Sequence, residues 1–152
     1  KGIPKPAPLF TKNSKFRIDG EKAQMAAVCS KFMSLANGAG MCMFGLFIGA
    51  KRVPTFGWLN AATGWRLTPE DYMTVGERIQ TLKQAFNVKH GIEPRNNFIS
   101  GRALGHPPQK RGANQGRSVD IEKLAPGYWE QFGWDTATGK PKEETLRKLG
   151  IQ

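Results

Sequence analysis

The sequence predicts an all-α fold of irregularly packed helices, and three observations support this prediction. Apolar residues recur at helical spacing in three segments, capping residues precede them, and glycine or proline stands where they end. A chain of 152 residues, 39% of them hydrophobic, is long enough to bury the core of one domain. No apolar run is long enough to span a membrane. We therefore expect one helical domain over residues 18–152.

Residues 1–17 are predicted to be an extended lead-in. They contain three prolines and five lysines or arginines and show no hydrophobic period. We expect them to lie on another part of a larger protein or to form a mobile tail. The first residue is Lys1 rather than Met, and no signal-peptide pattern precedes it, so we expect a processed chain or a piece of a larger one.

The first helix is expected over residues 21–35, where Asp19 and Gly20 open an apolar-faced segment. The residues on that face are Met25, Val28, Cys29 and Phe32. A glycine-rich bend follows, and Gly38 and Gly40 allow its backbone to approach another group closely. The apolar residues 41–50 then fit either a buried strand or a buried short helix. Because the neighbouring segments are predicted helices, we favour a short helix and turn.

The longest helix is predicted over residues 68–89. Thr68 can cap it, and Pro69 suits its first position. The carboxylate of Asp71 would be stabilised by the positive N-terminal end of the helix dipole. Gly91 and Pro94 mark its end. A single apolar stripe is expected to face the core, formed by Tyr72, Val75, Ile79, Leu82 and Phe86.

Residues 91–118 are predicted to be a long basic loop without helical or strand periodicity. Loops of this length are usually functional or disordered. Glu93 is its only acidic residue, against Arg95, Arg102, Lys110, Arg111 and Arg117. A solvated, mobile loop and a basic arm lying over a partner subunit, nucleic acid or anionic ligand explain this composition equally well.

Two further helices are predicted near the end of the chain. One starts at Ser118 or Asp120 and extends to residue 132, and Pro126 followed by Gly127 is expected to kink or split it. Its buried side is formed by Ile121, Leu124, Tyr128 and Phe132. A short helix over residues 142–149 follows, with Gly150 as its stop.

The charge balance favours an anionic partner. Lys and Arg total 23 against 12 acidic residues, a formal net charge of +11. Such a balance is typical of proteins that bind nucleic acid or anionic surfaces. It also suits the basic half of an interface whose acidic half, or phosphorylated cofactor, lies elsewhere. The two cysteines are too few for a disulfide framework, which favours a reducing, cytoplasmic setting.

Few residues have the spacing that site chemistry requires. There is no Cys-x-x-Cys, and neither His90 nor His106 has a catalytic or metal-ligating partner in the sequence. Cys29 lies on an apolar helical face, as a buried structural thiol does. Cys42 follows the glycine-rich bend, so it suits either a buried thiol or a thiolate that reaches an iron–sulfur cluster from a loop. The four tryptophans, with Tyr128, are expected to be core or interface anchors.

Four stretches together resemble a known enzyme family. They are Gly-Glu-Lys-Ala at residues 20–23; Asn-Gly-Ala-Gly-Met-Cys at 37–42; Leu-Asn-Ala-Ala-Thr-Gly-Trp at 59–65 with its continuation to residue 88; and residues 119–150, which include Gly-Trp-Asp at 133–135. They resemble the C-terminal region of the aldehyde ferredoxin oxidoreductase family, the tungsten or molybdenum bis-pterin enzymes. The resemblance covers about residues 20–151.

The resemblance implies roles for four residues. Cys42 would be the fourth ligand of a [4Fe-4S] cluster, whose other three ligands come from an upstream Cys-x-x-Cys-x-x-x-Cys segment absent here. Asn37 would contact the pterin, and Met41 and Met43 would lie against the same cofactor. The metal centre and the acid–base residues belong to earlier parts of such enzymes, so no catalytic residue is expected here and the fragment alone should be inactive.

The departures from the family pattern bear on function. Asn37 replaces an expected Asp, Asn96 and Asn97 replace an acidic pair, and Pro126 interrupts a helix. They suggest a divergent member whose substrate is not a simple aldehyde.

The resemblance implies an oxidoreductase that interconverts aldehyde and carboxylate and exchanges electrons with a ferredoxin-type carrier. Its partners would be the remaining domains of the enzyme, the carrier and the substrate. The alternatives are aryl-CoA reduction at a similar centre or a basic helical module that binds nucleic acid or protein, of which nucleic-acid binding is the less expected.

Overall fold

The structure is a computed structural model that describes residues 16–49, 53–96 and 99–151. Its longer helices are α1 (Gly20–Gly38), α3 (Thr55–Thr63), α4 (Pro69–Lys89) and α6 (Ile121–Glu130). The shorter ones are α2 (Met43–Gly49), α5 (Gly101–Leu104), α7 (Glu143–Lys148) and the 3-10 turn η2 (Pro94–Asn96). Within these ranges the β-type pairing consists of two isolated bridges, Gln109 with Gln115 and Trp134 with Pro141. The predicted all-α class is confirmed.

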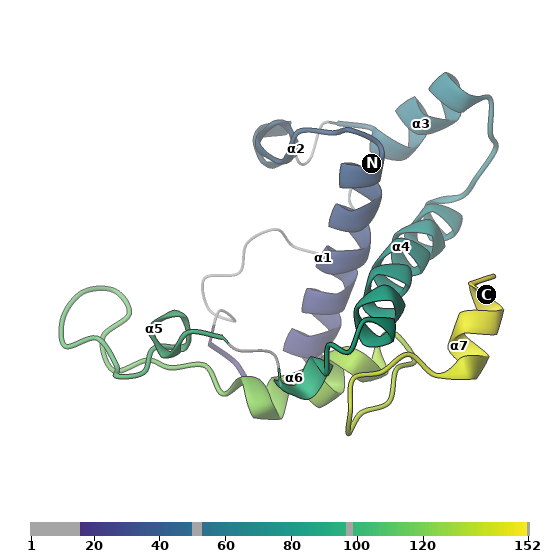
Figure 1. Cartoon of the computed structure of the whole chain (residues 1–152). Helices are drawn as coiled ribbons and strands as arrows, with labels where there is room; N and C mark the ends of the chain where they lie inside the picture. Colours follow the sequence, from purple (N-terminus) through teal and green to yellow (C-terminus); the bar gives the residue numbers. More distant parts are fainter. Residues whose placement is uncertain (1–15, 50–52, 97–98, 152) are drawn as a thin grey trace.

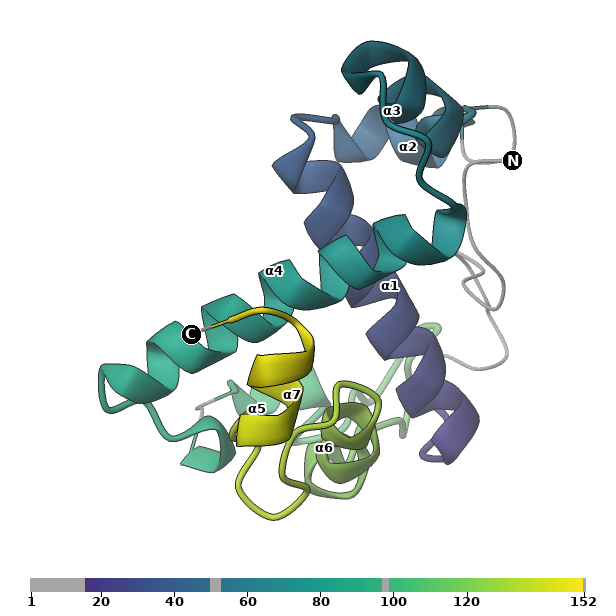
Figure 2. The same cartoon turned by 90° about the vertical axis from the view of Figure 1, so that its right-hand side faces the viewer.

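Helices α1 and α4 cross at the centre of the molecule (Figures 1 and 2). At the crossing, a Cβ at Gly76 would overlap the carbonyl oxygen of Lys31, so only glycine permits this approach. The Lys31 ammonium lies 2.7 Å from the Glu77 carboxylate and donates to the Gln131 carbonyl at 2.9 Å. This largely buried pair ties both helices to the segment after α6.

Both predicted starts of the long helices are confirmed. The Asp19 carboxylate accepts a hydrogen bond from the Lys22 backbone N–H at 2.8 Å, and α1 begins at the next residue. Thr68 and Asp71 form a reciprocal capping box at the start of α4, with Pro69 at its first position. Helix α1 ends at Gly38, three residues later than predicted.

One end of the α1–α4 pair carries residues 37–49 and 53–67, which we call the cysteine end (upper part of Figure 1). Its core centres on three rings: Phe56 stacks on Tyr72 at a centroid distance of 5.5 Å and meets the edge of Phe32 at 6.2 Å. The Asn60 side chain closes the following loop, bonding both the backbone N–H and the carbonyl of Leu67. The Tyr72 hydroxyl donates to the same Asn60 side chain at 2.8 Å.

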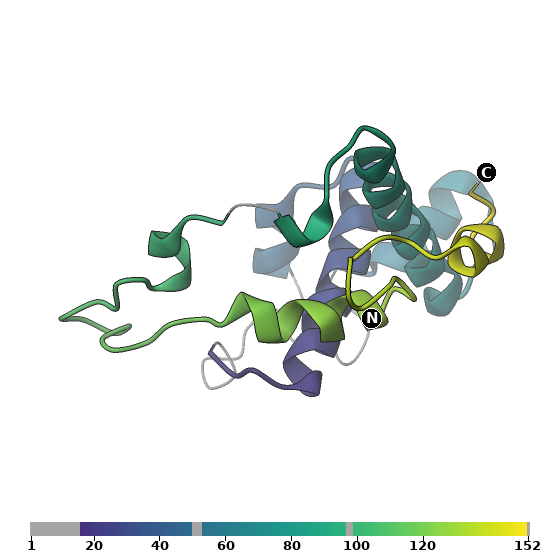
Figure 3. The ribbon, with the colours of Figure 1, turned by 60° about the horizontal axis from the view of Figure 1, so that its bottom comes forward.

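The other end carries residues 119–151, which we call the tryptophan end (Figure 3). Trp129, Phe132 and Trp134 form a buried aromatic cluster against α1. The Trp134 indole N–H donates to the Thr81 hydroxyl of α4 at 3.2 Å, and both side chains are buried. The Arg78 guanidinium donates to the Leu149 carbonyl at 2.6 Å, which fastens the chain after α7 to α4.

The predicted buried stripe on α4 is wrong over its second half. Leu82 and Phe86 are 53% and 59% exposed, whereas the buried residues of α4 are Tyr72, Gly76 and Thr81. The inner face of α4 is set by the close crossing at Gly76 and by the Trp134–Thr81 contact, and these leave Leu82 and Phe86 outside. The helical spacing of apolar residues predicted the helix correctly, but it did not predict which face of the helix is buried.

Helix α6 is not split at Pro126. It runs without interruption from Ile121 to Glu130, with the Asp120 side chain as its cap. Proline lacks the N–H that would bond to the Glu122 carbonyl, so it removes one helical hydrogen bond without ending the helix. Gly127 lies against α1, where an added Cβ would be 3.1 Å from that of Ala23.

The remaining segments were predicted unevenly. The short helix after the glycine-rich bend is confirmed as α2, and the last helix as α7. Helix α3 was not predicted, and the long basic loop contains η2 and α5. Residues 1–15 of the predicted lead-in lie outside the described residues. Among those described, no helix combines the length and apolarity needed to cross a membrane.

Candidate functional site

The turn that joins α1 to α2 brings the predicted site residues together. The Gly40 N–H donates to the Asn37 carbonyl at 3.1 Å, and the Met41 N–H donates to the Ala36 carbonyl at 2.9 Å. Gly40 has φ +71°, a left-handed conformation that favours glycine. These bonds close a sharp turn, so that Cys42 directly precedes α2.

The predicted site residues differ in exposure. Asn37, Cys42 and Met43 are exposed, whereas Met41 is half-buried and packs against the Phe32–Phe56 cluster. Cys42 is a free thiol, and its carbonyl accepts the Leu46 N–H at 3.0 Å. The turn therefore presents one thiol, one amide and one thioether outward while Met41 fixes the turn to the core.

Three aromatic residues of the cysteine end are exposed. Phe44 is 69% exposed, and Trp58 and Trp65 are 57% and 56% exposed. The sequence predicted that the tryptophans are core or interface anchors. Trp129 and Trp134 are core residues, whereas for the exposed Trp58 and Trp65 the interface role stays a prediction.

The side chains of the described residues show how much of a metal or cluster site this chain could form. No group of three or more His, Cys, Asp and Glu side chains able to hold a metal ion occurs within the described residues. A [4Fe-4S] cluster takes four ligands, usually cysteine thiolates. The exposed Cys42 fits one such ligand, and the turn around it leaves the sulfur accessible from outside. The described residues therefore fit one corner of a cluster site and not a complete one.

The other thiol lies apart from this turn. Cys29 is half-buried on α1, and burial raises the pKa of its thiol. Cys29 and Cys42 are separated by the C-terminal half of α1. A neutral thiol in that position fits the packing role expected from the sequence.

Neither histidine joins the turn. His90 is the C-cap residue of α4, and its ring lies 4.3 Å from the ring of Phe86. His106 is exposed in the basic loop. The expectation that neither histidine is a catalytic base stays a prediction.

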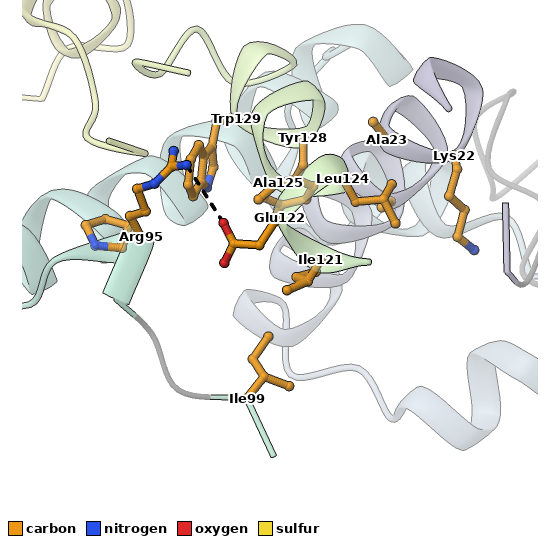
Figure 4. Close-up of a pocket in the computed structure, with 12 residues that line it drawn as sticks. Lys22, Ala23, Arg95, Ile99, Ile121, Glu122, Leu124, Ala125, Tyr128 and Trp129 are labelled. Carbon is orange, nitrogen blue, oxygen red and sulfur yellow. Dashed lines mark ion pairs between the residues drawn. The ribbon is translucent and has the colours of Figure 1, made fainter. Parts of the chain in front are cut away.

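A cavity of about 330 Å³ lies at the tryptophan end, between α1, α6 and the segment around η2 (Figure 4). Its walls are mostly apolar, with Ala23 and Ala26 from α1 and Leu124 and Trp129 from α6. The sequence did not predict this cavity, because its lining residues come from segments far apart in the chain.

The chain was compared with known proteins. A family model described as "Aldehyde ferredoxin oxidoreductase, domains 2 & 3" matches residues 2–151. The chain is 35% identical over 136 residues to the tungsten-containing aldehyde ferredoxin oxidoreductase of Pyrococcus abyssi. Identity to the proteins of the same name is 34% over 135 residues in Pyrococcus furiosus and 32% over 136 residues in Pyrococcus horikoshii. These matches cover 88–89% of the chain, which spans 22% of the length of each relative.

Proposed function

The chain belongs to the aldehyde ferredoxin oxidoreductase family, and from this membership we propose that it forms the C-terminal part of a pterin- and iron–sulfur-dependent oxidoreductase. The enzyme would interconvert an aldehyde and a carboxylate and exchange electrons with a ferredoxin-type carrier. Tungsten is favoured over molybdenum because the relatives are named as tungsten-containing. A cytoplasmic setting suits the two free cysteines.

The turn at residues 37–43 is the observation that carries this proposal. It is held by backbone hydrogen bonds on the inside and exposes the Cys42 thiol on the outside. An ordered, accessible thiol beside apolar side chains suits a ligand that meets a cofactor held mainly by another part of the enzyme. We assign Cys42 as one ligand of a [4Fe-4S] cluster.

The neighbouring residues would bind and shield the pterin. The Asn37 amide can donate one hydrogen bond and accept another at the pterin edge, whereas a carboxylate could only accept. Met43 would pack on the cofactor and keep water from it, since a thioether side chain adapts to irregular surfaces. Met41, half-buried against the core, would meet the cofactor only with the part of its side chain that the core leaves exposed. When bound, the cluster supplies one-electron transfer and the metal–pterin group supplies the redox chemistry. The acid–base residues would come from parts of the enzyme outside this chain.

The assignment of Cys42 is tested by Cys42→Ser in the complete protein. A serine hydroxyl is a poor substitute for a thiolate on iron, so we expect iron content and the visible absorption of the cluster to fall strongly. Cys29→Ser is the matched control and should keep the full cluster content. Equal cluster content in the wild type and Cys42→Ser would remove Cys42 from the site. In that case family membership would describe ancestry only.

Substrate preference is tested separately on the complete enzyme. Carrier reduction would be followed with aliphatic and aromatic aldehydes, and aryl-CoA reduction would be assayed with a reduced carrier. Turnover of aldehydes supports the proposed reaction. Turnover of aryl-CoA alone would favour the alternative chemistry at the same kind of centre.

A further inference from the structure

We propose that the cavity at the tryptophan end and the adjoining basic arm, residues 101–118, form a docking site for an acidic segment of a separate partner protein. A large apolar side chain of that segment would enter the cavity, and its acidic residues would meet the arm. This proposal does not depend on the proposed redox function.

The cavity suits an apolar anchor. Its volume of about 330 Å³ lies at the small end of the range for ligand pockets, and alanine, leucine and tryptophan side chains form its walls. Ile99, at its edge, is 41% exposed (Figure 4). Interfaces commonly concentrate their binding energy in a few large side chains that fill such pockets.

The basic arm is ordered by its own backbone. The Val119 N–H donates to the Leu104 carbonyl at 2.8 Å, which closes the base of the arm. Further out, the Gly116 N–H donates to the Gln109 carbonyl at 3.0 Å. The arm projects away from the crossed helices (Figures 1 and 3). A preformed arm costs less entropy on binding than a segment that must fold first.

The charge of the arm selects the partner. It carries Arg102, Lys110, Arg111 and Arg117, all exposed, and it contains no acidic residue. None of these four cations forms an ion pair with another described residue; the Arg117 guanidinium lies 5.0 Å from the centroid of the Phe16 ring. Arginine side chains pair well with carboxylates, so an acidic partner is the complementary one.

The cavity and the arm are adjacent in the chain. Ile99 stands two residues before the arm and Ile121 three residues after it, and both line the cavity. Two more cations, Lys22 and Arg95, stand among the lining residues, with Arg95 3.8 Å from Glu122. Glu122 also lines the cavity and offsets the charge of Arg95, so the unbalanced positive charge comes from Lys22 and from the arm.

The composition of the arm disfavours single-stranded nucleic acid. Such strands are usually bound by stacking their bases on aromatic side chains, and residues 101–118 contain no Phe, Tyr or Trp. The site also lies at the opposite end of α1 from Cys42. Changes to the docking site should thus leave cluster content unaltered, which separates this proposal from the proposed function.

The test begins with random peptides displayed on phage and selected against the complete protein. We expect enriched peptides to carry Asp or Glu on both sides of a Phe, Leu, Met or Trp. Affinity would then be measured by fluorescence polarisation with a synthetic enriched peptide. Replacing its apolar residue by Ala should weaken binding about tenfold or more, because the anchor would lose its buried area.

Variants of the protein assign the binding to this site. Arg102→Gln combined with Arg117→Gln should weaken binding and flatten its salt dependence, since two charge contacts would be lost. Ala26→Leu should weaken it independently by filling the cavity. The matched control is Lys89→Gln, an exposed cation on α4, which should bind as the wild type does. Cluster content and thermal unfolding, measured in parallel, show whether each variant is folded.

Three results would overturn the proposal. The first is no enrichment, which would mean that other parts of the same polypeptide cover the site. The second is enrichment of peptides without acidic residues, or binding that the arm and cavity variants do not change. The third is tighter binding of a single-stranded oligonucleotide than of the acidic peptide, with loss of both in the double arginine variant.

Discussion

The cysteine end and the tryptophan end use aromatic side chains in opposite ways. At the tryptophan end, Trp129, Phe132 and Trp134 are at most 8% exposed and are covered by α1 and α4. At the cysteine end, Phe56 is buried, but Phe44 and Trp58 remain more than half exposed. At the tryptophan end, other parts of the same chain therefore cover the aromatic side chains.

The difference shows which aromatic side chains the described chain leaves uncovered. Burial of a large aromatic side chain contributes about 1.5–3 kcal/mol, so a chain that leaves several exposed gives up stability that a partner surface would restore. Of the exposed aromatic residues, Phe44 directly follows Cys42 and Met43 in the chain, the residues proposed to meet the cofactor. The tryptophan end thus buries its aromatic cluster within the chain, whereas the cysteine end leaves aromatic side chains exposed.

The largest expected effect compares two tryptophans. Trp134→Ala should lower the free energy of unfolding by about 3–5 kcal/mol, because it empties a packed site and removes the bond to Thr81. Trp58→Ala should change it by about 0.5 kcal/mol or less in this chain. Urea denaturation of both variants measures the contrast. Similar losses would mean that Trp58 is already covered in solution.

A second comparison concerns the crossing of α1 and α4, the two helices that connect both ends. Gly76→Ala places a methyl group against the Lys31 carbonyl and should force α1 and α4 apart, at a cost of about 2–3 kcal/mol. Gly57→Ala in α3 is the control, because its Cβ would have no neighbour closer than 3.8 Å. It should be neutral or slightly stabilising, since alanine is the better helix former. Thermal unfolding followed by circular dichroism distinguishes the two, and a neutral Gly76→Ala would refute the close crossing.

Two buried threonines should respond differently to replacement by valine, with smaller changes in the free energy of unfolding. Thr81→Val leaves the Trp134 indole N–H without its acceptor and should cost about 1–3 kcal/mol. Thr55 is also buried, and its hydroxyl has no hydrogen-bond partner among the described residues. Thr55→Val should therefore be neutral or stabilising. Equal destabilisation by both changes would show that the Thr55 hydroxyl is bonded in solution.

Acid should weaken the contacts around the tryptophan end more than those at the cysteine end, because more carboxyl groups with a lowered pKa lie there. The pKa values of Asp19, Asp120 and Asp135 are lowered chiefly by hydrogen bonds from Lys22, Lys123 and Thr138. Because folding lowers these pKa values below 3.8, their contribution is complete above that pH and is lost as the pH falls through the folded values. Next to the cysteine end, at the start of α4, hydrogen bonds from Thr68 lower the pKa of Asp71.

Amide signals in NMR spectra recorded at decreasing pH would locate this loss. We expect the signals at the starts of α1 and α6 and in the turn after Asp135 to broaden as the pH falls below 3.8. Asp120→Asn should make the start of α6 less sensitive to acid. Simultaneous loss over the whole chain would contradict a difference between the two ends.

The sequence predicted helix starts well because caps are local. Thr68, Pro69 and Asp71 act within one turn of helix, so their spacing was sufficient. The exposed face of α4 could not be predicted, because it depends on where α1 crosses at Gly76, a contact between residues far apart in the sequence. Helix α3 was missed because Gly57 weakens the local helical signal and Pro54 precedes it without a side-chain cap.

The candidate site was predictable in part for the same reason. Cys42 and its neighbours lie within one turn, so their sequence motif already brings them together. The cavity is formed by α1, α6 and the segment around η2, which meet only in the folded chain. Its lining residues therefore gave no motif that could be read along the sequence.

The Asn60 side chain has a consequence for motion. The Asn60 side chain forms hydrogen bonds with both the backbone N–H and the carbonyl of Leu67, as a neighbouring strand would. It also accepts a hydrogen bond from the Tyr72 hydroxyl at 2.8 Å. The Leu67 amide, although in a loop, should therefore exchange its hydrogen with solvent as slowly as amides inside α4. Helix α3 and the start of α4 would move as one unit, carrying Trp58 and Trp65 together toward whatever surface they meet.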